Sequence, residues 1–208
     1  MSMELDLPPP YESHDPLPIS ATWNRRLNQI QPDLFNISCP TTRDYQVHSD
    51  KYSTLFVRVH RRNFTKPNLV IYLRDDDVEQ DIAHCDFREK IGQCDMGVSK
   101  SSSGESSTIW WSDTDRSIPV SKMYRFSAKV QPSGGGEIVH KIFIWKRTSG
   151  LELVDEATST IAAVAPDMRL DQPKLGSLEV LVPYGPDFNL IALTTLLTVC
   201  ERLREEDS

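Results

Sequence analysis

Thirteen consecutive uncharged residues, from Phe188 to Cys200, constrain the fold of this chain more than any other feature. A helix rises about 1.5 Å per residue, so this stretch covers roughly 20 Å, whereas a bilayer core of about 30 Å needs about 20 apolar residues. The stretch also contains Asn189 and three threonines. It therefore predicts a helix, over about residues 187–204, that is buried in protein rather than in a membrane.

The apolar residues of this stretch surround the predicted helix almost completely. One broad side carries four leucines, and Phe188, Ile191 and Val199 lie on the opposite side among the threonines. A helix that is apolar nearly all round must be surrounded by other parts of the fold. The leucines that we expect to form the structural core of this helix are Leu190, Leu193, Leu196 and Leu197.

Most of the remaining chain has the alternating pattern and the turn residues of β-strands. About ten strands followed by one apolar helix predict a mainly β (α+β) protein, in which a closed antiparallel barrel surrounds the C-terminal helix. The alternative is an α+β sandwich with the helix on one face. The predicted strands are 45–48, 54–60, 69–73, 81–87, 108–112, 124–130, 138–146, 151–155, 161–165 and 177–182.

Five features in a fixed order resemble a known family. They are an aromatic-rich hairpin that ends in Trp145 and Lys146, then "LELVDE", "IAAVAP", "GSLEVLVP" and the helix "FNLIALTTLLTVCERLREE". In this order they are similar to the uncharacterised fungal tubby-like family, within the group of tubby C-terminal domains, LURP-one-related proteins and phospholipid scramblases. The resemblance implies a closed antiparallel barrel of about twelve strands around a hydrophobic helix. It does not by itself define a function, because folds host many functions.

The N-terminal segment differs in composition from the rest of the chain. Residues 1–22 are rich in proline and acidic residues and contain no lysine or arginine, which predicts a disordered arm ahead of a tubby-like domain over residues 23–208. Within the arm, Pro8, Pro9, Pro10 and Tyr11 fit the Pro-Pro-x-Tyr pattern that WW domains bind, because consecutive prolines are already in the polyproline II conformation. The motif implies a WW-domain partner, such as a HECT-type ubiquitin ligase. The alternative is an inert, solubilising arm.

Charge is segregated within the predicted barrel. From Lys51 to Arg74 there are basic residues and no acidic ones, whereas residues 75–95 are strongly acidic. One interpretation is that neighbouring strands pair opposite charges on a solvated face. The other is an anion or lipid site that receives a phosphoinositide head group, and its candidate residues are Arg58, Arg61, Arg62 and Lys66.

The sequence contains none of the common catalytic, phosphate-loop or metal-binding motifs, so we expect no enzyme activity, cofactor or metal. A pI of about 5.2 argues against nucleic-acid binding. The first residues, "MSMELDL", lack the features of a signal peptide, which favours a cytoplasmic protein that is peripheral to membranes if it binds lipid. We therefore expect a non-enzymatic adaptor that binds a partner through Pro8, Pro9 and Tyr11. The alternatives are a phosphoinositide or membrane-surface binding module, and an enzyme whose site is not visible in the sequence.

Overall fold

The computed structural model of the protein describes residues 33–41, 44–49, 53–60, 68–75, 78–87, 94–98, 107–109, 124–131, 137–182, 184–185 and 187–206. The chain divides into two units, Met1–Gln31 and Pro32–Ser208, and all the described residues belong to the second unit. The predicted arm over residues 1–22 therefore lies outside the described residues, and the structure does not test this prediction.

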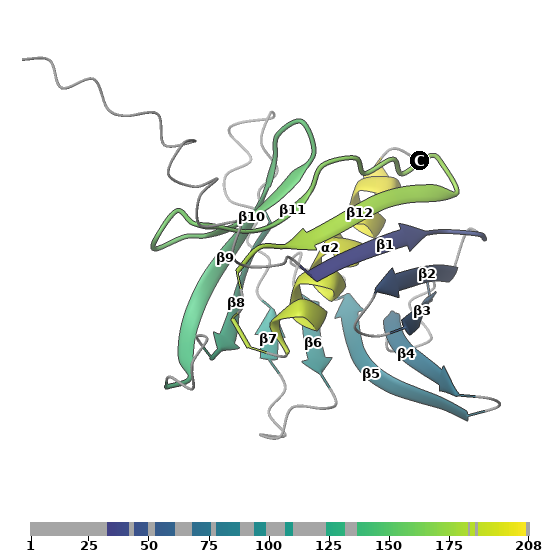
Figure 1. The fold of residues 1–208 in the computed structure, drawn as a ribbon, viewed down its shortest axis with the longest axis horizontal. Coiled ribbons are helices and arrows are strands. Elements are labelled where there is room, and N and C mark those ends of the chain that lie inside the picture. Colours follow the sequence, from purple (N-terminus) through teal and green to yellow (C-terminus); the bar gives the residue numbers. More distant parts are fainter. Residues whose placement is uncertain are drawn as a thin grey trace, which may run out of the picture. The chain divides into compact units, whose positions relative to one another are not determined.

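The described residues of the second unit form β-strands followed by one long helix (Figure 1). The helix begins within one residue of the predicted start and extends two residues beyond the predicted end. The elements are β1 (Asp33–Ser38), β2 (Asp44–Ser49), β3 (Ser53–Val59), β4 (Leu69–Asp75), β5 (Val78–Phe87), β6 (Cys94–Val98), β7 (Ser107–Ile109), β8 (Tyr124–Val130), β9 (Val139–Arg147), β10 (Leu151–Asp155), β11 (Ile161–Ala165), β12 (Lys174–Val180) and α2 (Phe188–Glu206).

Within the described ranges, the strands form one antiparallel sheet of 12 strands, in the order β7-β6-β5-β4-β3-β2-β1-β12-β11-β10-β9-β8. Strands that follow each other in sequence pair, apart from β7 and β8, and β1 also pairs with β12. This long-range pair, in which Phe35 lies opposite Leu178, joins a meander of seven strands to a meander of five. The first and last strands of the described sheet thus meet in its middle.

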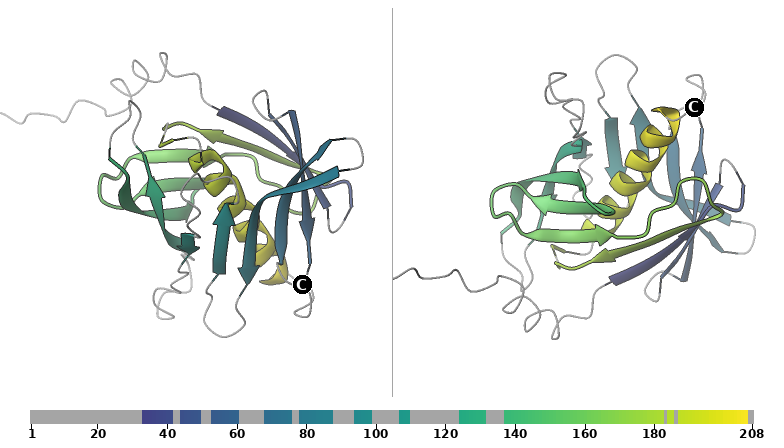
Figure 2. Two further views of the ribbon diagram at one scale, coloured as in Figure 1. Left: turned by 90° about the horizontal axis from the view of Figure 1, so that it is seen from below. Right: turned by 90° about the horizontal axis from the view of Figure 1, so that it is seen from above.

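The sheet curves around α2, so that strands of both meanders contact the helix (Figure 2). Trp145 of β9 bonds the middle of the helix, and Tyr45 of β2 bonds its C-terminal part. Every residue from Phe188 to Glu201 is buried. This confirms the predicted C-terminal helix that packs against an antiparallel sheet.

The prediction of a closed barrel is wrong. The sheet begins at β7 and ends at β8, and within the described ranges no ladder hydrogen bond joins these two strands, although they lie beside each other. The physical reason is that β7 comprises only Ser107–Ile109, so its second edge offers few backbone groups for a ladder with β8. The fold is an open, curved sheet wrapped around one helix.

Local chemistry explains how the uncharged stretch of the helix, residues 188–200, is buried although it contains Asn189 and three threonines. The hydroxyls of Thr194 and Thr198 donate to carbonyls one turn back, at 2.6 and 2.8 Å, so their burial leaves no unpaired donor. Near the start of the helix, the amide of Asn189 donates to the carboxylate of Asp33 in β1. Gly185 has a φ of +100°, a conformation that glycine adopts without steric cost, and it turns the chain into the helix. No helix among the described residues has the length and apolar character needed to cross a bilayer.

Candidate functional site

Most of the residues predicted from the sequence to bind partners or anions lie outside the described ranges. Pro8, Pro9 and Tyr11 of the arm motif are among them, and so are the predicted anion-binding residues Arg61, Arg62 and Lys66. Arg58 is described, because it belongs to β3. The four core leucines Leu190, Leu193, Leu196 and Leu197 are all at most 5% exposed.

Arg58 belongs to a cluster on the outer face of β3, β4 and β5, which we call the arginine clamp and define as Arg58, Arg74, Glu79, Phe56 and Tyr72. Strand alternation places Leu55 and Val57 on the buried face, so Phe56 and Arg58 face outward. Nη2 of Arg58 donates to both carboxylate oxygens of Glu79 at 3.3 Å, and Nη2 of Arg74 donates to Oε1 at 2.8 Å. Two guanidinium groups therefore converge on one carboxylate.

Aromatic rings hold both guanidinium groups of the arginine clamp. The rings of Phe56 and Tyr72 stack with centroids 5.8 Å apart. The guanidinium of Arg58 lies 5.0 Å from the Tyr72 centroid, and that of Arg74 lies 4.8 Å from the Phe56 centroid. Cation–π contacts of this kind fix the orientation of an arginine.

The arginine clamp is accessible to solvent. The side chains of Arg58, Arg74 and Glu79 are 42%, 44% and 35% exposed. The hydrogen bond from Arg74, helped by the charge of Arg58, lowers the pKa of Glu79, and the same bond raises the pKa of Arg74. Arg58 thus bonds an opposite charge on the solvated face, but its partner lies on β5, beyond the neighbouring strand β4, whereas the pair of Arg74 and Glu79 joins the neighbouring strands β4 and β5. Sequence reasoning missed Arg74 and Glu79 as its partners, although the change of charge sign between 74 and 79 marks this hairpin.

A simpler exposed ion pair lies between β8 and the turn after β10. The guanidinium of Arg125 bonds the carboxylate of Glu156 through Nε at 3.0 Å and through Nη2 at 2.7 Å. The two side chains are 41% and 38% exposed, which is close to the exposure of the arginine clamp. One arginine here faces one carboxylate, so the pair has no excess positive charge.

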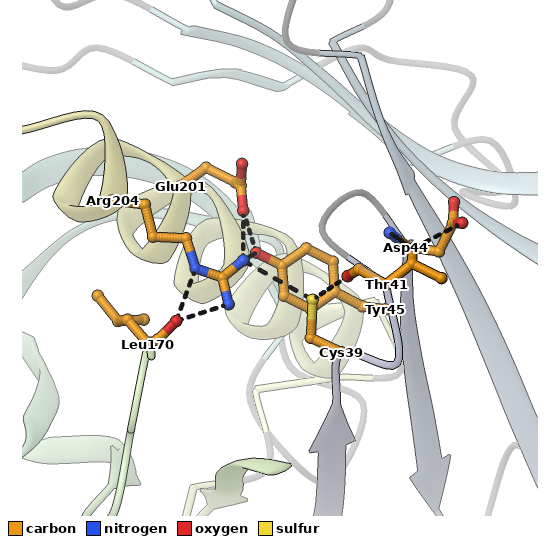
Figure 3. A network of polar contacts seen from close by, with 7 residues as sticks. All are labelled: Cys39, Thr41, Asp44, Tyr45, Leu170, Glu201 and Arg204. Carbon is orange, nitrogen blue, oxygen red and sulfur yellow. Dashed lines mark hydrogen bonds and ion pairs between the residues drawn. The ribbon is translucent and has the colours of Figure 1, made fainter. Parts of the chain in front are cut away.

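A second polar cluster, the helix-end network, lies between the C-terminal part of α2, β2 and the loop before β12 (Figure 3). Nη1 of Arg204 donates to Oε1 of Glu201 at 2.9 Å and to the hydroxyl of Tyr45 at 2.7 Å. The Tyr45 hydroxyl in turn donates to the same carboxylate oxygen. Nε and Nη2 of Arg204 both donate to the carbonyl of Leu170, at 3.1 and 3.0 Å.

This network is part of the interior of the protein. The Glu201 side chain is 1% exposed and that of Arg204 is 16% exposed. Burial, together with the adjacent Glu201 carboxylate, raises the pKa of Tyr45 far above its ordinary value. Burial also raises the pKa of the neighbouring Cys200 thiol to about 12. Tyr45 therefore stays protonated and acts as a hydrogen-bond donor, which suits a role in anchoring the end of the helix to the sheet.

A third cluster lies near the start of α2 and contains Lys141, Asp155 and Tyr184. Oδ2 of Asp155 accepts hydrogen bonds from Nζ of Lys141 and, at 3.0 Å, from the hydroxyl of Tyr184. Burial acts to raise the pKa of Asp155, but the bonds from Lys141 and Tyr184 outweigh it, and the net effect lowers that pKa. Burial and the bond to Asp155 raise the pKa of Tyr184 to about 12. The cluster holds a fully buried carboxylate in its charged form.

The part of the chain that the structure describes contains no group of three or more His, Cys, Asp or Glu residues arranged to hold a metal ion. No family model matches the chain, and the searches of curated proteins and of solved structures found no match either. The polar groups on which a function can be argued are therefore the arginine clamp on the outer face and the two clusters that anchor the helix.

Proposed function

We propose that this protein is a non-enzymatic adaptor of the tubby-like group, in which Pro8, Pro9 and Tyr11 of the N-terminal arm bind a WW-domain protein such as a HECT-type ubiquitin ligase. The domain that follows the arm is the scaffold that carries this motif. The proposal combines a sequence motif with one structural observation, which is that the protein's own helix fills the interior of its curved sheet.

The filled interior supports a binding role at the outside of the protein. Every residue of α2 from Phe188 to Glu201 is buried, and the polar groups on it bond to the sheet or back to the helix. Small-molecule sites are usually concave and partly apolar, and here the apolar concave face of the sheet is covered by the helix. A partner would therefore contact the outer face of the sheet or the arm.

The chemistry of the motif supports the choice of a WW domain. A run of three prolines, Pro8 to Pro10, favours the polyproline II conformation before binding, so little conformational entropy is lost in the complex. The proline rings and the Tyr11 ring then dock in an aromatic-lined groove. Assignment to the tubby-like group belongs to the same proposal, and an antiparallel sheet curved around a C-terminal helix supports it.

The test is titration of the full chain into a purified WW domain from a HECT-type ligase, followed by calorimetry. We expect Tyr11→Ala to weaken binding by roughly tenfold or more, because the tyrosine is an aromatic anchor of the motif. Pro16→Ala is the matched control, since this proline belongs to the same arm but lies outside the motif. Equal affinity of the Tyr11→Ala variant and the natural chain would refute the proposal.

Phosphoinositide or membrane-surface binding through Arg58, Arg61, Arg62 and Lys66 is the second candidate function. The outward orientation of Arg58 favours it. The two candidates are separated by one pair of variants. An adaptor loses WW-domain binding on Tyr11→Ala and keeps it on Arg61→Ala. A lipid-binding protein sediments with phosphoinositide vesicles, loses this sedimentation on Arg61→Ala, and sediments less as the salt concentration rises.

A further inference from the structure

We propose that the arginine clamp is a receptor for a phosphomonoester group carried by a partner protein, and that Glu79 occupies this receptor until the partner displaces it. The inference goes beyond the adaptor function, because it assigns a second binding surface, on the outer face of β3, β4 and β5. It does not depend on Tyr11.

The geometry of the clamp is that of an occupied anion site. Two guanidinium groups from neighbouring strands, those of Arg58 and Arg74, bond one carboxylate at distances of 3.3 and 2.8 Å. Both arginines also donate to the hydroxyl of Tyr72, at 3.4 Å. Two positive charges therefore face one negative charge, and Glu79 does not neutralise the site.

A phosphomonoester fits this site better than a carboxylate does. It carries about 1.5 to 2 negative charges near neutral pH and presents three acceptor oxygens, whereas a carboxylate carries one charge and presents two oxygens. Bonds between guanidinium and phosphate groups form in parallel pairs and are among the strongest in proteins. An incoming phosphomonoester can thus match both arginines, while Glu79 matches the charge of only one.

The aromatic rings lower the entropic cost of binding. Arg74 lies 4.8 Å from the Phe56 centroid and 5.7 Å from the Tyr72 centroid, so its guanidinium already contacts both rings. Arg58 is held 5.0 Å from the Tyr72 centroid. Side chains that are oriented before binding lose less rotamer freedom when a ligand arrives.

Local charge favours a phosphate on a partner protein over one on a membrane. β5 carries two exposed carboxylates, Glu79 and Asp81, and the chain has a formal net charge of -7. An anionic bilayer surface would bring many negative charges against this face and be repelled, whereas a single phosphorylated side chain would meet only the clamp.

The experiment measures binding of the full chain to a short capped peptide that contains one phosphoserine, to its unphosphorylated twin, and to phosphatidylcholine vesicles with and without phosphatidylinositol bisphosphate. We expect binding of the phosphopeptide only. Arg74→Gln and Arg58→Gln should each weaken it by roughly tenfold or more, because each removes charged hydrogen bonds to the phosphate. Thermal unfolding of both variants reports whether the fold is retained.

The decisive variant is Glu79→Gln, which removes the negative charge of the occupant and leaves both arginines. We expect phosphopeptide binding to tighten by about two- to fivefold, in line with the strength of an exposed ion pair. The matched control is Glu156→Gln, which breaks the equally exposed pair with Arg125 and should leave the affinity unchanged.

Three results would overturn the proposal. They are absence of phosphopeptide binding, an affinity that does not change on Arg74→Gln and Arg58→Gln, and equal effects of Glu79→Gln and Glu156→Gln. Binding to phosphoinositide vesicles without binding to the peptide would overturn the assignment to a protein partner. Tyr11→Ala should leave phosphopeptide binding intact, so failure of this proposal and failure of the WW-domain proposal are distinguishable.

Discussion

The indole nitrogen of Trp145 in β9 donates a hydrogen bond to the hydroxyl of Thr195 in the middle of α2, at 3.0 Å. Both residues are fully buried. The Thr195 hydroxyl in turn donates to the carbonyl of Ala192, at 3.0 Å. This bond joins the middle of the helix to β9, at the face of α2 that carries Thr195.

Substitution of Thr195 tests this relationship. Thr195→Val keeps the shape of the side chain but leaves the buried indole N–H without its acceptor, which should lower the free energy of unfolding by about 1 to 3 kcal/mol. Thr194→Val is the matched control, since the Thr194 hydroxyl bonds the Leu190 carbonyl of its own helix, and its loss should cost clearly less. Urea unfolding measures both. A similar cost for the two variants would show that the bond to Trp145 contributes little.

The helix-end network predicts a large loss of stability when its cation is removed. Arg204→Met leaves the Glu201 carboxylate buried without its guanidinium, and we expect a loss of about 3 to 5 kcal/mol. Tyr45→Phe removes one donor to the same oxygen and should cost about 1 to 3 kcal/mol. Because the residues share partners, the double variant should differ from the sum of the two by more than about 0.5 kcal/mol.

The control for this series is Arg169→Met, since Arg169 is exposed and should change stability by less than about 0.5 kcal/mol. Equilibrium unfolding in urea gives all four values. Additive costs in the double variant would contradict a shared network and would mean that Arg204 and Tyr45 stabilise the helix end independently.

Local sequence patterns were sufficient for strands whose alternation is strong. The bounds of β8, β10 and β11 are those predicted, because regular apolar positions such as Leu151 and Leu153 indicate the inward face directly. Two strands were missed. In β1 the inward residues are Phe35 and Ile37, but the apolar Leu34 beside them faces outward and breaks the alternation. In β6 the Asp95 and Gly97 residues are more typical of turns.

Relationships between distant elements could not be predicted in the same way. Barrel closure depends on hydrogen bonds between strands β7 and β8, which alternation within each strand does not encode. Glu201 and Arg204 are three residues apart in an apolar helix and mark a buried pair, but their partner Tyr45 lies 156 positions before Glu201 and has no local signal. The sequence pattern placed Arg58 on a charged face but did not identify Glu79 as its partner, because that contact crosses from β3 to β5.

Stability should fall at acid pH through Asp155. The pKa of Asp155 is lower in the folded state than in the unfolded state, so the unfolded state binds more protons as the pH falls. The stability that the carboxylate contributes is present above about pH 3.9 and is lost as the pH falls through the folded-state pKa. Asp155→Asn should therefore cost about 1.5 to 3 kcal/mol at neutral pH and much less in acid. Urea unfolding of both proteins as a function of pH measures this difference. Asp171→Asn is the exposed control, and a cost for Asp155→Asn that does not shrink in acid would contradict the assignment.

Burial of Cys200 predicts that its thiol is protected in the folded protein. The side chain is fully buried, so the reagent cannot reach the sulfur. Its pKa is raised to about 12 from an ordinary value of about 8.5, so almost no thiolate is present at pH 8. Alkylation by iodoacetamide, mapped by mass spectrometry, should be slower than in the urea-unfolded chain by a factor on the order of 10³ or more, since it requires opening of the core. Leu196→Ala lowers stability by about 2 to 5 kcal/mol and should speed alkylation of Cys200 by at least roughly tenfold. Rapid labelling of Cys200 in the natural chain, or a rate that does not respond to Leu196→Ala, would mean that α2 leaves the sheet without global unfolding.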